Sequence, residues 1–185
     1  MFSRKTVFVV GAGASHDLGF PTGDDLKARI VKILERKEDN FIFHHKHLGQ
    51  TVRLLCDRDG GLSWTHHFEK YAEAALRIRN GLSLAISIDN YLHAHQNDEL
   101  VQLLGKIAIA TAILDAERDS ALNFGKKTLV SGIDRHLTSE KMKLSWLLSM
   151  MRMLTSGRSV KDLSILFSNV SFVVFNYDRC IEQFD

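Results

Sequence analysis

The sequence predicts an α/β fold in which a parallel sheet, incomplete in this chain, carries a large helical insertion. Two apolar, β-branched runs, at residues 6–10 and 170–175, have the composition of buried strands. The long stretch between them shows helical apolar spacing, with more helices than one crossover connection needs. We therefore assign residues 1–21 and 160–185 to the sheet and residues 22–159 to the insertion.

Composition limits the classes of protein. The chain has 185 residues, of which 45% are hydrophobic and 25% charged, as in ordinary soluble domains. The net charge of +2 is too small to imply a direct nucleic-acid or membrane partner, and no apolar run has the length of a membrane span. Two cysteines cannot form a four-thiolate zinc site, so we expect a cytoplasmic protein without a metal.

The first strand runs directly into the glycine turn Gly11–Ser15. Its small residues allow a sharp turn and the close approach of another group, and the helix that follows would direct free N–H groups there. This arrangement suits a phosphate or pyrophosphate. Packing between strand and helix is the alternative. A signal peptide after Arg4 and Lys5 is less favoured, because the apolar run is short and β-branched.

Helical spacing dominates the middle of the chain. Thr22, as a cap with Asp25 three residues later, marks the first helix of the insertion. The segment 35–47 is expected to be partly loop. Further helices are predicted after Ser63 with an interruption at Gly81, then over residues 84–92, 100–117 and 140–154, with a break at 57–61. Residues 107–114 are apolar nearly all round, which predicts that they are buried.

The second apolar run is typical of a strand covered on both faces, as in a parallel sheet. It stops at Asn176-Tyr177-Asp178. Because ligands of open α/β sheets bind beyond the carboxyl ends of the strands, adjacent strands would bring these side chains to the glycine turn. We interpret the whole chain as a Rossmann-like parallel sheet that carries a helical insertion. The alternative is that the tripeptide only caps a helix that begins near Arg179.

The glycine turn, continued through Gly19-Phe20-Pro21, resembles the sirtuin opening motif Gly-Ala-Gly-x-Ser followed by Gly-Ile-Pro. Phe175-Asn176-Tyr177-Asp178 is similar to the sirtuin motif Gln-Asn-Ile-Asp. The closer similarity is to bacterial sirtuin-like domains, which tend to have Asn-Tyr-Asp here. Residues 87–92 and 105–110 also resemble the helical region of that subgroup.

The resemblance implies that the chain binds NAD and that its parent protein cleaves the nicotinamide–ribose bond. The glycine turn would hold the pyrophosphate, Asn176 would contact the ribose or orient a water, and Asp178 would recognise the carboxamide. Bacterial domains of this type are often NAD glycohydrolases in antiphage defence. The expected cofactor-binding residues are Gly11, Ala12, Gly13, Ala14, Ser15, Pro21, Asn176 and Asp178, and Asn176 is also the expected catalytic residue.

Departures from the sirtuin pattern narrow the expectation. Protein deacylases carry Asp-Phe-Arg where this chain has residues 22–24, and they hold zinc with four cysteines, so deacylation is less favoured. The family's catalytic histidine follows the Asn-x-Asp motif, whereas no histidine follows Asp178 here. We therefore expect an N-terminal portion, inactive alone, of a protein with a further C-terminal region or effector domain. A non-catalytic sensor of NAD or ADP-ribose is the alternative, and homo-oligomer formation is left open.

Other chemistry-bearing residues have weaker patterns. The histidines at 44–47, 66–67 and 93–95 lack paired metal-ligand spacing and favour a surface role. Asp89 is interpreted as a helix-packing or capping residue, with a place in a pocket as the alternative. Cys180, just past the Asn-x-Asp motif, has either a lowered thiol pKa near a helix start or an inert core position.

Overall fold

A computed structural model describes residues 2, 4–36, 42–58, 64–120 and 143–184. The chain forms two compact units. The sheet unit comprises residues 1–22 and 116–185, and the helical unit comprises residues 23–115. The helical unit thus begins one residue after the predicted start of the insertion, but it ends well before the predicted 159.

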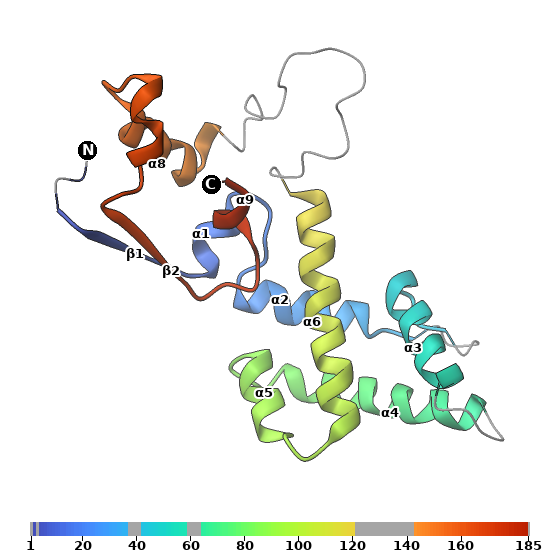
Figure 1. Cartoon of the computed structure of the whole chain (residues 1–185). Helices are drawn as coiled ribbons and strands as arrows, with labels where there is room; N and C mark the ends of the chain where they lie inside the picture. The colour runs from blue at the N-terminus through green and yellow to red at the C-terminus, as the bar shows by residue number, and fades with distance from the viewer. Residues whose placement is uncertain (1, 3, 37–41, 59–63, 121–142, 185) are drawn as a thin grey trace, which may run out of the picture. The chain divides into compact units, whose positions relative to one another are not determined.

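The sheet unit is built on two parallel strands. β1 (Thr6–Val10) pairs with β2 (Val170–Val174) from Thr6↔Val170 to Val10↔Val174. The short helix α1 (Ala12–His16) follows β1 and the short helix α9 (Cys180–Phe184) follows β2, at the same end of the pair (Figure 1). A parallel pair among helices confirms the α/β class with a helical insertion.

The two faces of this strand pair differ. On one face, Phe8 and Phe172 stack with their ring centroids 5.6 Å apart. On the other face, Val7 is 59%, Val9 71% and Val173 43% exposed. The prediction of strands covered on both faces is therefore wrong for the described part of the chain. The prediction rested on the continuous apolar run. Side chains alternate between the two faces of a strand, and here only one of the two sets packs into a core.

Helix α8 (Trp146–Thr155) belongs to the sheet unit, together with the 3₁₀ turn η1 (Val160–Ile165). Its buried side chains belong to the same hydrophobic cluster as Leu18 and Phe20; they are Leu147, Met150 and Leu154. This shared core explains why the boundary between the two units lies before residue 159. Ser145 caps α8 by accepting a hydrogen bond from the Leu148 N–H at 3.3 Å. The predicted start at residue 140 lies outside the described residues.

The helical unit contains α2 (Gly23–Ile33), α3 (Lys46–Arg58), α4 (Trp64–Leu82), α5 (Ile88–Ala94) and α6 (Glu99–Asp119) as far as Asp115. The sequence predicted all of these except α3. Its fully buried residues are Leu48, Val52 and Cys56, and Leu55 packs beside them in part. This short stripe lies between the predicted loop and the predicted break. The expected cap Ser63 and residues 59–61 of that break lie outside the described residues.

One core fills the helical unit, and α6 contributes to it along its length. Ala108, Ile109, Ala112 and Ile113 are buried, whereas Leu114 is 61% exposed, so the predicted burial of residues 107–114 holds for one side of the helix. Among the described helices, none is both long and apolar enough to cross a membrane.

Candidate functional site

The glycine turn at the end of β1 is open. Gly11 is extended, with φ −115° and ψ 176°, and its carbonyl accepts a hydrogen bond from the Ala14 N–H at 2.9 Å. A Cβ atom built at Gly11 or Gly13 would meet no atom within 4 Å. Within the described chain, neither glycine is therefore required by a left-handed backbone or by packing. This argues against the packing explanation of the motif.

Ser15 joins the two predicted halves of the site. Its hydroxyl donates to Asp178 Oδ1 at 2.9 Å and accepts from Asn176 Nδ2 at 3.0 Å. Ser15 and Asp178 are 2% and 7% exposed. The adjacent parallel strands thus bring the turn after β1 and the polar residues after β2 into direct contact.

Asn176 carries a buried polar atom that the described chain leaves unsatisfied. Its Nδ2 group is used by Ser15, but its Oδ1 atom has no hydrogen-bond donor among the described residues. A buried acceptor without a donor costs about 1–3 kcal/mol. The free-energy cost is removed by a ligand or water that presents an O–H or N–H to this oxygen.

Asp178 also has the capping role that the sequence left open. Its Oδ1 atom accepts a hydrogen bond from the Cys180 N–H, the first of α9, at 3.1 Å. Capping and the contact with Ser15 therefore use the same carboxylate. A carboxylate has about four lone-pair positions, so these two bonds leave capacity for a ligand donor.

Two supports of the site were not anticipated from the sequence. Trp146 donates its indole N–H to the Ala14 carbonyl at 2.8 Å and holds the glycine turn from α8. Glu117 binds Arg179 through two hydrogen bonds of 2.9 and 3.1 Å, which fixes the chain just after Asp178. Both contacts join residues far apart in sequence, and no local pattern signals them.

Pro21 makes no hydrogen bond in this polar cluster, and Cys180 enters it through its backbone N–H. Pro21 is buried beside Phe20. Cys180 is 2% exposed, and burial raises the pKa of its thiol far above the ordinary value. Of the two interpretations of Cys180, the buried core position is therefore the one that the structure confirms, and a lowered thiol pKa is not found. The helix start cannot compensate for the loss of solvent around a thiolate.

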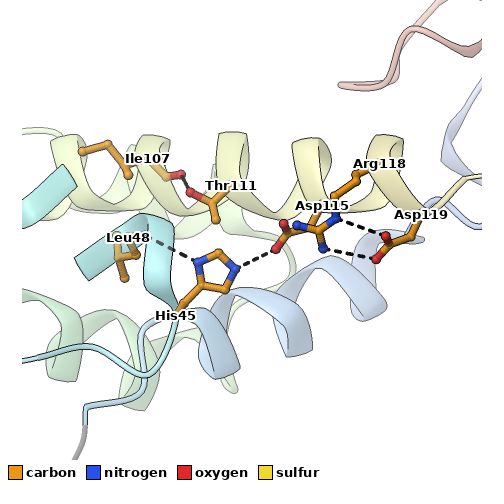
Figure 2. A network of polar contacts seen from close by, with 7 residues as sticks. All are labelled: His45, Leu48, Ile107, Thr111, Asp115, Arg118 and Asp119. Carbon is orange, nitrogen blue, oxygen red and sulfur yellow. Dashed lines mark hydrogen bonds and ion pairs between the residues drawn. The ribbon is translucent and has the colours of Figure 1, made fainter. Parts of the chain in front are cut away.

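His45, from the first of the histidine clusters, has a structural role in the helical unit. Figure 2 shows His45, whose Nε2 atom lies 2.7 Å from Asp115 Oδ2 and whose Nδ1 atom lies 3.4 Å from the Leu48 N–H. His45 therefore sits at the start of α3 as a cap tied to α6. Asp89 lies exposed in the first turn of α5. No group of three potential metal ligands occurs among the described residues.

Comparisons with known protein families, with curated proteins and with solved structures find no match to this chain. The similarity to sirtuin-like domains thus remains a prediction that rests on the motif residues.

Proposed function

We propose that this chain binds NAD at the carboxyl end of the β1–β2 pair, in a Rossmann-like sheet, and that the complete protein hydrolyses NAD to nicotinamide and ADP-ribose. The observation that carries the proposal is the unsatisfied Asn176 Oδ1 atom, next to the Ser15–Asp178 pair and an open glycine turn. The resemblance to sirtuin-like domains supplies the identity of the ligand. It is also the only support for a role in antiphage defence.

Three parts of NAD, the pyrophosphate, the nicotinamide ribose and the carboxamide, have a matching group in this arrangement. The space beside Gly11 and Gly13 admits a pyrophosphate against the backbone. The Asn176 oxygen accepts a ribose hydroxyl or orients the attacking water, and the Asp178 carboxylate accepts the carboxamide N–H. Positioning the ribose and its nucleophile is the main requirement for breaking the nicotinamide–ribose bond, which proceeds through an oxocarbenium-like centre.

The exposed sheet face supports a larger sheet. Val7, Val9 and Val173 form an apolar surface on two strands, and a two-stranded parallel pair is marginal without further cover. We propose that further polypeptide of the complete protein, a C-terminal region or an effector domain, covers this face.

NAD is expected to change the signal of Trp146, because its indole binds the glycine turn. The chain contains two tryptophans, so 5-fluorotryptophan labelling gives two ¹⁹F resonances, which the Trp146→Phe variant assigns. NAD should shift the Trp146 resonance in a saturable way. Gly13→Leu should abolish the shift by filling the open space. Gly23→Leu, at another helical glycine with open space, should preserve it. An unmoved Trp146 resonance at saturating NAD contradicts the proposed site.

Nicotinamide release tests the reaction. The complete protein is expected to release nicotinamide from NAD, and Asn176→Ala should stop it, because the ribose or the water loses its acceptor. This chain alone is expected to bind NAD without releasing nicotinamide. Unchanged turnover of the Asn176→Ala protein would remove Asn176 from the mechanism.

A sensor of NAD or ADP-ribose is the second candidate function. It is favoured by one observation: none of the described hydrogen bonds of Ser15, Asn176 and Asp178 reaches a histidine that could act as a general base. NAD binding by the complete protein without release of nicotinamide would select the sensor.

A further inference from the structure

The helical unit contains a pocket of about 670 Å³, between α3, the start of α4 and the segment at residues 42–44. This volume is within the range of about 300–1,000 Å³ that is usual for small-molecule sites. The pocket shares no residue with the glycine turn. Its aromatic and charged lining residues point to a class of ligand.

The apolar wall of the pocket is aromatic and well supported. Trp64 stacks on Phe68 with ring centroids 5.4 Å apart and an interplanar angle of 16°. Phe68 in turn lies 5.7 Å from Phe43, and these two rings are 2% and 1% exposed. The partly exposed Trp64 ring is therefore held in place by a buried aromatic base. Such a wall suits a planar ring.

Another part of the lining carries positive charge. Lys46 and Arg53 are exposed on α3, two helical turns apart on one side of the helix, and both line the pocket. Neither has an ion-pair partner in the described part of the chain. Asp57 is the one acidic residue of the lining, so the cations are in excess. An anionic group is the complementary ligand chemistry.

Gly49 keeps the pocket open. A Cβ atom at this position would lie 3.7 Å from the nearest atom, the Phe43 carbonyl oxygen, which is an ordinary contact. Its backbone is not left-handed, since the positive-φ glycines among the described residues are Gly19 and Gly157. A glycine inside a helix costs about 1 kcal/mol relative to alanine. The chain therefore carries a destabilising residue that neither packing nor backbone geometry requires, at a position that lines the pocket.

We propose that this pocket is a nucleotide-binding site, with the base against Trp64 and the phosphate near Lys46 and Arg53. The inference goes beyond the proposed NAD site, because it concerns other residues in the other unit. It rests on none of the sirtuin motifs.

The two tryptophans make the test direct, because Trp64 lines this pocket and Trp146 binds the glycine turn. In the 5-fluorotryptophan-labelled chain, AMP, GMP, CMP and UMP are titrated separately. At least one should shift the Trp64 resonance in a saturable way. Its nucleoside and inorganic phosphate, each alone at the same concentration, should produce little shift, since each provides only half of the contacts.

Charge reversal tests the phosphate contacts. Lys46→Glu and Arg53→Glu should each weaken nucleotide binding about tenfold or more, the equivalent of about 1.4 kcal/mol. Lys70→Glu, at an exposed lysine of α4 outside the pocket, should leave the affinity unchanged.

Filling the pocket tests its location. Gly49→Leu should block the Trp64 shift without lowering the unfolding midpoint, whereas His47→Leu, on α3 outside the lining, should bind as wild type. The inference is overturned if no nucleotide moves Trp64, if inorganic phosphate alone reproduces the shift, or if the Lys46→Glu, Arg53→Glu and Lys70→Glu variants bind equally. A shift of Trp146 alone would leave the NAD site standing and remove this one.

Discussion

Replacement of Gly81 by alanine is expected to destabilise the helical unit by about 2 kcal/mol. A Cβ atom at Gly81 would lie far inside the van der Waals contact distance of the Tyr91 ring, so one of the two must shift. That ring cannot move freely, since Tyr91 is 5% exposed, its hydroxyl donates to the Arg77 carbonyl at 2.9 Å, and it stacks on His95 at 4.2 Å. Displacing it costs roughly 3 kcal/mol, of which about 1 kcal/mol is recovered by removing a helical glycine.

The measurement is urea and thermal unfolding followed by circular dichroism. A loss of this size should lower the unfolding midpoint by roughly 10 °C for a unit of this length. Gly49→Ala is the matched control, because the same substitution in α3 has room and should stabilise by up to about 1 kcal/mol. Equal effects of the two alanines, or a Gly81→Ala chain that unfolds no earlier than wild type, would contradict the packing argument.

Tyr91 itself provides a second check on the cause. In a Tyr91→Leu background the ring is gone, so Gly81→Ala should cost much less than in the wild-type chain. The difference between the two costs measures the coupling between the positions. An unchanged cost would assign the loss to something other than the clash.

Gly81 also shows why the sequence predicted the helices only in part. The interruption predicted at Gly81 is found, since α4 ends one residue later at Leu82, but Gly81 itself is still helical. Its smallness is required by Tyr91, which lies on the next helix and is invisible to a local pattern. By contrast, the long helix predicted at 100–117 is found at Glu99–Asp119, because an apolar run of this length, rich in alanine, leucine and isoleucine, indicates a helix by itself.

The same distinction applies to the sheet and to the units. The first strand and the glycine turn are local patterns, and both are found where the sequence predicted them. The exposed face of Val7 and Val9, and the boundary at Asp115, depend on which distant side chains share a core. Those contacts cannot be derived from spacing along one segment.

The sequence predicts the location of the candidate site only if the two strands are assumed to be parallel neighbours. Adjacent strands place Asn176 and Asp178 beside Ser15, and the pairing of β1 with β2 brings together residues 163 positions apart. The shared hydrogen bonds of Ser15 and the support from Trp146 required the folded chain. Their geometry depends on how α8 and α9 pack, which no motif specifies.

Replacement of Asp178 by alanine is expected to cost about 3 kcal/mol and to disorder the site. Its Oδ1 atom is the shared acceptor for the Ser15 hydroxyl and the Cys180 N–H, in surroundings where Ser15 and Cys180 are each 2% exposed. A buried donor without a partner costs about 1–3 kcal/mol, and two donors lose their partner here. Water that enters the vacated space can bond these donors and reduces the loss. Asp162→Ala is the control: its carboxylate accepts the Ser159 N–H at 3.0 Å in an exposed turn, and its loss should cost much less.

Unfolding in urea, followed through the ¹⁹F resonance of Trp146, measures this loss in the sheet unit. Equal costs for Asp178→Ala and Asp162→Ala would show that the shared acceptor is unimportant. Asp178→Asn separates the structural role from the ligand role, because its side-chain oxygen can still accept from Ser15 and Cys180 while the charge is lost. If Asp178→Asn folds as wild type but no longer responds to NAD, the carboxylate contacts the ligand. If Asp178→Asn folds and still binds NAD, the Asp178 carboxylate only holds Ser15 and α9 in place. The polar contact with the ligand is then made by Asn176.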